Sequence, residues 1–212
     1  MSLPFAYIFD IFTELNKNGQ TIFHYDHSKD TGRCGADNIY AANPGAEFWG
    51  AASGNIYNSS GNSIATNRPG QNFFCYWDGD LLEETYNGGD NTVGSISKYG
   101  KDGAIKTLTG SLTNNSTKAT PCYMGDILGD WREEFLVRTP DHKIRIYSTT
   151  TETPWRMQSL WYDHQYRNGM VWEPCGYNQP PHTSYFLGEM EGITMAPPPL
   201  TMTDRTEVKN NE

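Results

Sequence analysis

Near its beginning the chain reads Leu15-Asn16-Lys17-Asn18-Gly19-Gln20-Thr21-Ile22, and the pattern returns as Tyr57-Asn58-Ser59-Ser60-Gly61-Asn62-Ser63-Ile64. A third copy reads Tyr99-Gly100-Lys101-Asp102-Gly103-Ala104-Ile105, so that Gly19, Gly61 and Gly103 recur every 42 residues. Asn-Gly and Asp-Gly pairs supply the positive φ angles of tight turns between antiparallel strands, and the flanking Ile and Tyr residues favour strands. Each copy therefore predicts a β-hairpin.

A second marker follows the same rhythm. It reads Cys34-Gly35-Ala36-Asp37, then Cys75-Tyr76-Trp77-Asp78, then Cys122-Tyr123-Met124-Gly125-Asp126. After each marker we expect an acidic residue to open the next strand, at Glu47, Glu83 and Glu134. Units of roughly 40 to 45 residues with several short strands are typical of propeller blades, which bury their faces against their neighbours. We therefore predict an all-β fold, a β-propeller or part of one.

The repeat is clear only from about residue 15 to residue 148. We expect an N-terminal edge segment at residues 1–14, propeller blades over residues 15–195 and a polar tail at residues 196–212. Residues 153–188 are rich in Trp, Tyr and Pro and fit the period poorly, so they predict a short helical turn with long loops over one face. The repeat count predicts an incomplete ring.

The composition supports a strand-rich chain and argues against two classes of partner. The 21 Gly, 12 Pro, 13 Tyr, 9 Phe and 6 Trp residues disfavour a helix bundle. Sixteen Lys and Arg stand against 25 Asp and Glu, a net charge of -9, and no basic run is present, which argues against nucleic acid. The longest apolar run, Phe73-Phe74-Cys75-Tyr76-Trp77, is far shorter than the roughly 20 residues that span a membrane.

Nine residues, Asp126-Ile127-Leu128-Gly129-Asp130-Trp131-Arg132-Glu133-Glu134, resemble a segment of the rhamnogalacturonan lyases of polysaccharide lyase family 11. The likeness continues in the same order along residues 13–188. The other matching segments are Thr31-Gly32-Arg33, Pro44-Gly45-Ala46-Glu47, Trp77-Asp78-Gly79-Asp80, Asn114-Asn115-Ser116-Thr117-Lys118, Arg145-Ile146-Tyr147-Ser148-Thr149-Thr150 and Gly176-Tyr177-Asn178-Gln179-Pro180-Pro181-His182.

The resemblance implies an eight-bladed, calcium-containing propeller that cleaves the rhamnose–galacturonate backbone of pectin by β-elimination. The family's catalytic domain is more than twice as long as this chain, which is similar to its C-terminal part. We therefore expect a partial ring of about four blades, with self-association or contact with the missing blades at its uncovered faces. The family also implies an extracellular or periplasmic protein, although the first residues of this chain lack the features of a signal peptide.

The resemblance assigns a cleft to two segments. It implies that Lys118 takes the proton or contacts the leaving group, with Tyr177 as its partner, and that Asn115, Ser116 and Thr117 bind the sugar. Relatives often carry glycine at the position of Ser116 and an amide side chain at that of Pro174. Without the resemblance, the lysine reads as a solvated surface residue, residues 114–117 as a polar turn and the tyrosine as a packing residue.

Asp126, Asp130 and Glu134 occupy the first, fifth and ninth places of a stretch that resembles a calcium loop. Leu128 removes the oxygen ligand expected at the third place. The alternative is that Arg132 neutralises Asp126 or Glu134 through an ion pair. The run Asp78-Gly79-Asp80 is a second calcium candidate and also fits an ordinary turn.

Two functional hypotheses remain open at this stage. The first is a calcium-assisted rhamnogalacturonan lyase, of which this C-terminal portion is weak or inactive alone because half of the substrate contacts are absent. The second is a non-catalytic, carbohydrate-binding propeller fragment. Turnover of the polysaccharide distinguishes the two, because β-elimination leaves an unsaturated sugar that absorbs ultraviolet light.

Overall fold

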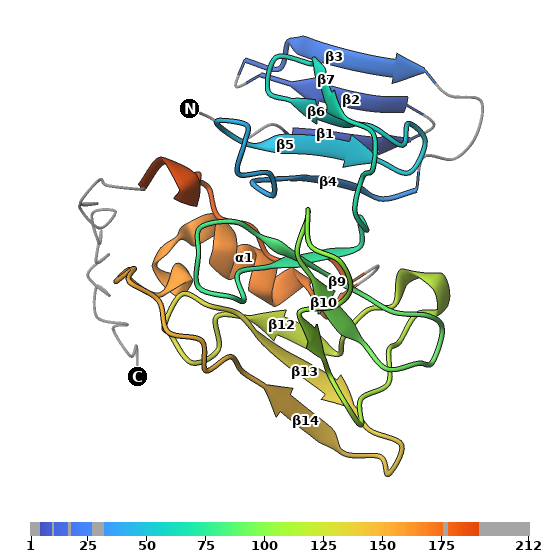
Figure 1. Ribbon diagram of the computed structural model, residues 1–212, viewed down its shortest axis with the longest axis vertical. Helices are drawn as coiled ribbons and strands as arrows, with labels where there is room; N and C mark the ends of the chain where they lie inside the picture. The colour runs from blue at the N-terminus through green and yellow to red at the C-terminus, as the bar shows by residue number, and fades with distance from the viewer. Residues whose placement is uncertain (1–4, 10, 17, 27–31, 176–177, 191–212) are drawn as a thin grey trace, which may run out of the picture.

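The computed structural model describes residues 5–9, 11–16, 18–26, 32–175 and 178–190 (Figure 1), and the predicted polar tail lies outside these ranges. Within them the regular structure is mostly β-strand in antiparallel pairs. The described helices are α1 (His164–Trp172) and the short 3-10 helices η1 (Ser116–Lys118), η2 (Leu160–Tyr162) and η3 (Leu187–Met190). The predicted all-β class is confirmed, whereas no closed ring of sheets is present in the described chain.

The described strands form four sheets, here called sheets I to IV, and each runs up and down in chain order. Sheet I contains β1 (Phe5–Phe9), β2 (Ile11–Leu15) and β3 (Thr21–Asp26). Sheet II contains β4 (Cys34–Asp37), β5 (Glu47–Gly50), β6 (Ile56–Asn58) and β7 (Ser63–Ala65). Sheet III contains β8 (Phe73–Cys75), β9 (Glu84–Asn87), β10 (Ser95–Ser97) and β11 (Lys106–Thr107). Sheet IV contains β12 (Tyr123–Gly125), β13 (Glu134–Arg138) and β14 (Ile144–Tyr147).

The three predicted glycine turns are confirmed. Gly19, Gly61 and Gly103 have φ angles of 76°, 79° and 74°, and each lies in the last hairpin of its sheet. The first two turns share their hydrogen bonds as well as their sequence. Asn16 Oδ1 accepts from the amides of Asn18 and Gln20 at 2.9 and 3.0 Å, and Asn58 Oδ1 accepts from the amides of Ser60 and Asn62 at 3.1 and 3.0 Å. The sequence repeat therefore encodes a repeated turn.

The four sheets pack face to face in chain order, with aromatic side chains at each junction. Phe48 and Tyr57 of sheet II form a buried cluster on which Phe23 and Tyr25 of sheet I pack. The next cluster joins sheets II and III through Ile39, Trp49, Ile56 and Phe74. The largest joins sheets III and IV through Phe73, Cys75, Trp77, Tyr86, Ile96, Leu108, Met124, Phe135 and Val137. Each sheet therefore buries its faces against its neighbours.

The C-terminal segment lies beside β12, the edge strand of sheet IV, and packs against the neighbouring loops (Figure 1). Asp163 caps α1, since its Oδ2 accepts from the amide of Tyr166 at 3.1 Å. Tyr166 and Met170 on the buried side of α1 pack against Trp131 and Tyr76. The helix has nine residues, more than the short helical turn expected from the sequence, because a capped start and two buried side chains hold it in place.

The first residue of the second strand is a glutamate in sheets II, III and IV. In each case one carboxylate oxygen accepts hydrogen bonds from two consecutive amides of the loop before it. The glutamates and their donors are Glu47 with Ile39 and Tyr40 (2.9 and 2.9 Å), Glu84 with Trp77 and Asp78 (2.8 and 3.2 Å), and Glu134 with Ile127 and Leu128 (3.0 and 3.0 Å). The strand in sheet III begins at Glu84, not at the predicted Glu83.

The glutamates also correct the predicted cysteine marker. Glu47, Glu84 and Glu134 pair across the first two strands with Asp37, Cys75 and Gly125 respectively. Cys34 therefore lies three residues before the position that Cys75 occupies, and the two cysteines are not equivalent. The marker matched residues that share chemistry and spacing but not their place in the sheet.

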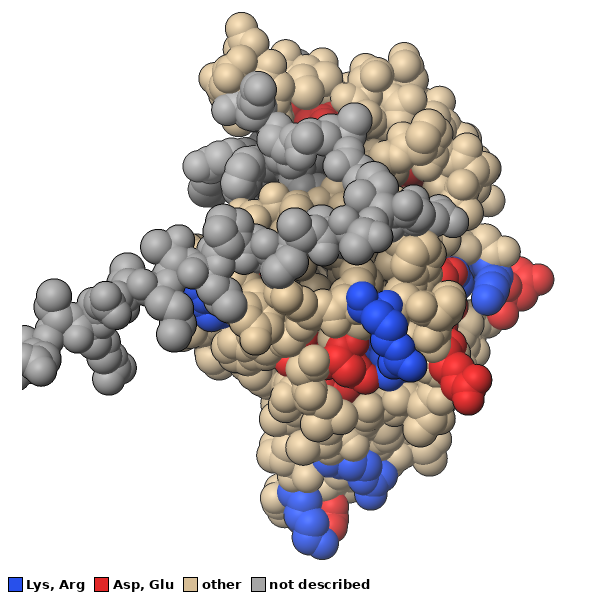
Figure 2. All heavy atoms as spheres, turned by 90° about the vertical axis from the view of Figure 1, so that its left-hand side faces the viewer, with Lys and Arg blue, Asp and Glu red and all other residues tan. Residues whose placement is uncertain are grey.

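No helix among the described residues is long and apolar enough to cross a bilayer. On the face in Figure 2, acidic and basic side chains lie beside one another over the lower part of the molecule, and much of the remaining surface is uncharged.

Candidate functional site

The loop assigned to the cleft is a short excursion between sheets III and IV, closed at its base by backbone hydrogen bonds. Asn114 and Thr120 pair through amide and carbonyl in both directions, at 2.9 Å each. Between them Asn115, Ser116 and Ala119 have φ angles of 61°, 52° and 49°, in the left-handed region that side chains rarely adopt. Such strain is held only where the surroundings fix it, and it is common at functional sites.

Arg138 of β13 fixes the base of this loop. Its Nε donates to Asn114 Oδ1 at 2.6 Å, and its Nη2 donates to the Thr113 carbonyl at 2.8 Å and to Asn91 Oδ1 at 2.5 Å. The arginine therefore ties the loop to sheet IV and to the loop before β10. A planar guanidinium with several donors suits this role, since it fixes orientation as well as distance.

The loop also contacts the segment that follows Tyr177. Asn72 Nδ2 donates to the Thr117 carbonyl at 3.3 Å, and Asn178 Nδ2 donates to the Pro121 carbonyl at 3.1 Å. The buried Arg33 joins both sides, because its Nη1 donates to the Asn72 carbonyl at 3.1 Å and its Nη2 to the Asn178 carbonyl at 3.0 Å. Residues far apart in the sequence thus meet beside this loop.

The predicted site residues have different surroundings. Asn115, Ser116 and Thr117 are exposed, and Lys118 is half-buried. The described residues provide no hydrogen bond or ion pair for the Lys118 ammonium group. The second predicted catalytic residue, Tyr177, lies outside the described residues, as does Gly176. The roles assigned to these residues stay predictions.

Sequence reasoning missed Asn72 and Arg138 and used Arg33 only as part of a matching segment. Each acts through a contact with a residue at least 24 positions away, for example Asn72 with Thr117 and Arg138 with Asn114. No local sequence pattern predicts such long-range contacts. The only signal was the resemblance itself, which placed Arg33 and Asn178 in matching segments.

The carboxylates predicted to hold calcium bind the chain around them. Asp126 Oδ2 accepts from Ser159 Oγ and from the Leu160 amide, at 2.7 Å each. Both oxygens of Glu134 are used, Oε2 by its loop amides and Oε1 by Ser148 Oγ at 3.2 Å. Burial raises the pKa of both carboxyls, although these hydrogen bonds oppose the shift.

Asp130 points its carboxylate at Arg132, not at the other two acids. Its Oδ2 lies 2.5 Å from Arg132 Nη2, and its Oδ1 accepts from the Arg132 amide at 3.1 Å. The arginine forms an ion pair, as the alternative expected, but with Asp130 in place of Asp126 or Glu134. Among the described residues these three acids do not form a group whose oxygens gather closely enough for one ion. Calcium at this loop stays a prediction.

The second calcium candidate is filled by a lysine. Oxygens of Asp78, Asp80 and Glu84 lie within 4.8 Å of one another, and Lys98 Nζ stands 2.8, 2.6 and 2.8 Å from them. Burial alone would raise the pKa of Asp78, but the hydrogen bond and charge of Lys98 lower it. Burial of Glu84 outweighs the lysine and raises its pKa to about 7. The Lys98 ammonium group therefore occupies the place that a metal ion would take.

A cavity of about 680 Å³ lies elsewhere, between the loop after β4 and the loop after β8. Its lining includes Asn38, Asn43, Asp80, Trp155 and Phe186 and no residue of the loop at 114–120. A concave site with aromatic rings and a few polar groups is typical of ligand pockets. Because no described residue of the assigned cleft lines this cavity, the catalytic assignment rests on the loop and not on the cavity.

The chain matches the family model described as "Rhamnogalacturonan lyase family 11, C-terminal domain" over residues 10–199. It is 40% identical over 191 residues to the rhamnogalacturonan endolyase YesW of Bacillus subtilis, covering 87% of this chain and 29% of the relative. It is 36% identical over 197 residues to the exolyase YesX of the same organism, covering 85% and 32%. The crystal structure of YesW superposes with a TM-score of 0.76, at 36% identity, over 88% of this chain and 34% of that one.

These comparisons cover most of this chain but only about a third of each curated relative. The family model covers residues 10–199, and the sequence and structural matches each cover 85% or more of this chain. The chain belongs to rhamnogalacturonan lyase family 11, to whose C-terminal domain it corresponds.

Proposed function

We propose that this chain is the C-terminal part of a rhamnogalacturonan lyase that cleaves the rhamnose–galacturonate backbone of pectin by β-elimination. The observation that carries the proposal is the loop around Lys118, where a strained backbone holds exposed polar side chains and an ammonium group that no described residue engages. The similarity to an endolyase and an exolyase of this polysaccharide gives the substrate class. Endo and exo action remain equally compatible with it.

The reaction breaks the C5–H bond of a galacturonate and the C4–O bond to the next sugar, and it forms a C4–C5 double bond. The proton passes to a base, and the departing sugar oxygen takes up a proton. We assign proton abstraction or leaving-group contact to Lys118, with Tyr177 as its partner. Its position half-buried on a loop fixed by Arg138 supports this role, because a base must be held within about 3 Å of the proton it removes.

Asn115, Ser116 and Thr117 are proposed to bind the sugar. Their side chains are exposed on the same loop, and amides and hydroxyls both donate to and accept from sugar hydroxyls. The contacts of Arg33, Asn72 and Asn178 support the proposal from the other side, because they hold the segment after Tyr177 next to this loop.

We also propose that the chain forms a partial β-propeller of about four blades. Four consecutive up-and-down sheets that stack face to face support this interpretation, and so does the chain's coverage of about a third of its relatives. Sheets I and IV each have three strands, while sheets II and III have four. The uncovered sheet at each end is proposed to contact further blades or another copy of the chain.

Calcium assistance is part of the proposal. When bound to the uronate carboxylate, a calcium ion would stabilise the negative charge that develops as the C5 proton leaves. The arrangement of Asp126, Asp130 and Glu134 does not favour a site made by these three, since Arg132 holds Asp130 and the loop amides hold Glu134. Asp126 is likewise held by the chain, since Ser159 and the Leu160 amide donate to its Oδ2 and the amides of Gly129 and Trp131 also interact with its carboxylate. An extracellular or periplasmic location, carried over from the family, is likewise a proposal.

The alternative is a domain that binds the polysaccharide without cleaving it, with the cavity beside Trp155 as its binding site. An activity assay separates the two. The chain is tested alone and fused to the upstream part of a homologous lyase, and unsaturated product is followed by ultraviolet absorbance. We expect little cleavage by the chain alone and clear cleavage by the fusion. No cleavage by the fusion, with binding of rhamnogalacturonan retained, contradicts the lyase proposal and supports the alternative.

A further inference from the structure

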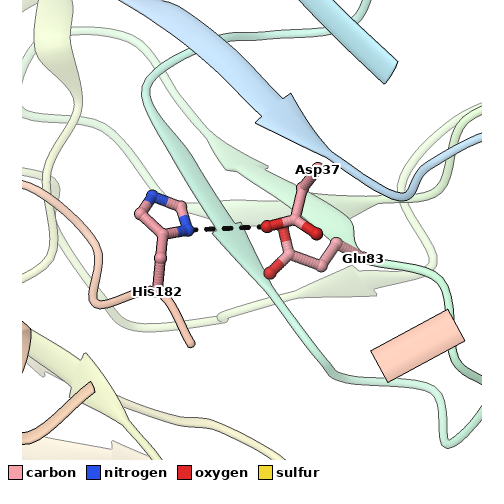
Figure 3. Close-up of side chains that lie close together, drawn as sticks. All are labelled: Asp37, Glu83 and His182. Atoms are coloured by element: carbon pink, nitrogen blue, oxygen red, sulfur yellow. Dashed lines mark ion pairs between the residues drawn. The ribbon is translucent and has the colours of Figure 1, made fainter. Parts of the chain in front are cut away.

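A second group of metal-ligating side chains lies away from the loop at Lys118, where three distant segments meet (Figure 3). Asp37 ends β4, Glu83 directly precedes β9, and His182 lies in the C-terminal segment after α1. One donor atom of each lies within 4.8 Å of the others. His182 Nδ1 is 3.5 Å from Asp37 Oδ2, and in Figure 3 the ring and both carboxylates point toward a common space.

Two of the donor atoms are buried and receive no hydrogen bond from a described residue. Glu83 is 4% exposed, and no described residue donates to its Oε2. His182 Nδ1 makes no hydrogen bond with the described residues beyond its 3.5 Å approach to Asp37 Oδ2, although the side chain as a whole is 38% exposed. A buried polar atom that makes no hydrogen bond costs roughly 1–3 kcal/mol. One donor atom of each side chain lies within 4.8 Å of the others, so a single ligand could contact all three.

The group contains two carboxylates, and its one basic partner among the described residues is His182, which pairs with Asp37. Among the described residues no lysine or arginine pairs with Asp37 or Glu83, whereas Lys98 sits at the centre of the Asp78–Asp80–Glu84 group. Asp37 and Glu83 lie close enough for a hydrogen bond between their side chains when one carboxyl is protonated. Two buried carboxylates this close are costly unless a cation or a proton neutralises them.

We propose that Asp37, Glu83 and His182 bind one divalent transition-metal ion of the Zn²⁺ or Mn²⁺ class, distinct from the family's calcium. An imidazole nitrogen with two carboxylate oxygens matches the ligands of Zn²⁺ and Mn²⁺, whereas calcium takes six to eight oxygens. Zinc ligands bind at about 2.0–2.2 Å, so small side-chain rotations close the present spacing. The exposed edge of His182 leaves a path for the ion and space for a water ligand.

Bound metal would add a link between three parts of the fold that already pack together. Asp37 belongs to sheet II, Glu83 to the loop that enters the second strand of sheet III, and His182 to the C-terminal segment. The same junction is bridged by a backbone hydrogen bond from the Glu83 amide to the Asn38 carbonyl at 2.8 Å. The ion would therefore act as a structural link, and its binding would raise the melting temperature.

The test uses the untagged 212-residue chain, freed of metal with a chelator. Zn²⁺, Mn²⁺ and Ca²⁺ are titrated separately by calorimetry, and melting curves are recorded with and without each ion. We expect one equivalent of Zn²⁺ or Mn²⁺ to bind and to raise the melting temperature. Glu83→Gln and His182→Gln should weaken binding at least tenfold.

Matched controls use side chains of the same type outside the group. Glu173→Gln removes another buried carboxylate, and His164→Gln removes another exposed imidazole, so both should bind like the parent. Absence of Zn²⁺ and Mn²⁺ binding by the parent overturns the proposal and leaves Glu83 neutralised by a proton. Unchanged affinity in Glu83→Gln and His182→Gln also overturns it. Should neither variant fold, anomalous scattering from Zn²⁺-soaked crystals of the parent decides, with a peak elsewhere contradicting the site.

Discussion

The loop at residues 114–120 and the loop at residues 126–134 flank the same strand, β12, and use their polar side chains in opposite ways. In the second loop the carboxylates of Asp126 and Glu134 accept hydrogen bonds from their own surroundings. In the first loop Asn115, Ser116 and Thr117 point outward, and no described residue engages the Lys118 ammonium group.

The difference shows which acidic residues build the fold. Glu134 repeats the hydrogen bonds of Glu47 and Glu84 in two other sheets, so its role follows from its place in the repeat. The loop at Lys118 has no counterpart in the repeat and keeps a strained backbone. A polar residue that recurs with the period therefore indicates a structural role, and the loop at Lys118, which breaks the period, is the place to test for a functional one.

The largest effect should come from Lys118→Ala in the fusion with the upstream part of a homologous lyase. A general base contributes about 10²- to 10⁴-fold in rate, so kcat should fall by that order while KM changes little. The melting temperature should stay near that of the parent, since the ammonium group engages no described residue. Lys106→Ala, an exposed lysine of β11, is the control. A kcat equal to that of the parent would contradict the catalytic role.

Lys98→Met tests the lysine-filled acidic group. The change leaves Glu84, which is 0% exposed, without its cation, and breaking a buried pair in this way costs about 3–5 kcal/mol. Urea unfolding should show a loss toward the lower end, because the side chains of Asp78 and Asp80 are 21% and 49% exposed and water can solvate them. Lys101 has a side chain that is 60% exposed, with Nζ 4.0 Å from Asp78 Oδ2, so Lys101→Met should have little effect. Equal losses in the two variants would contradict the special role of Lys98.

Glu134→Ala tests the repeated carboxylate. The change removes the acceptor of the Ile127 and Leu128 amides, and the free energy of unfolding should fall by about 1–3 kcal/mol. The loss is limited because Leu128 is exposed, so water can hydrogen-bond its amide instead. Glu134→Gln keeps one acceptor oxygen and should lose less. Chemical denaturation of both variants measures the difference. If alanine and glutamine cost the same, the hydrogen bonds to the amides do not explain the position of the glutamate.

Other positions show how much of the fold the sequence could predict. The glycine turns were found because turn chemistry is local. The strand start was wrong by one residue, at Glu83 in place of Glu84, because two adjacent glutamates satisfy the same spacing. Contacts such as Arg33 with Asn178 were not predicted, since the fold brings together residues that no local pattern connects. The group of Asp37, Glu83 and His182 was missed for the same reason.

The fourth prediction concerns pH. Burial raises the pKa of Glu133 to about 8 and that of Glu173 to about 9, from 4.5. Between pH 4.5, the pKa of these groups in the unfolded chain, and their folded-state pKa of about 8 or 9, the folded chain binds more protons than the unfolded chain. The stabilising contribution is complete below pH 4.5 and is lost as pH rises through the folded-state pKa.

Each such group contributes a slope of at most about 1.4 kcal/mol per pH unit. Urea unfolding of the chain should therefore show stability declining from about pH 5 to pH 9. Glu173→Gln cannot ionise and should flatten the decline between pH 7 and pH 9. A variant with the full slope of the parent would show that another group titrates there.

The smallest effect should come from Asp130→Ala, and it tests the loop at 126–134 for calcium. The side chain of Asp130 is 46% exposed and its carboxylate pairs with Arg132, so its loss should cost less than about 1 kcal/mol in calcium-free buffer. If calcium binds to Asp126, Asp130 and Glu134 as predicted, added calcium stabilises the parent more than the variant, because a ligand that binds only the folded state adds stability. Melting curves with a chelator and with calcium measure the difference, and Asp141→Ala, an exposed acid paired with Lys143, serves as the control. A parent whose melting temperature does not respond to calcium would remove these three residues from the calcium proposal and leave them with the structural role that their hydrogen bonds already describe.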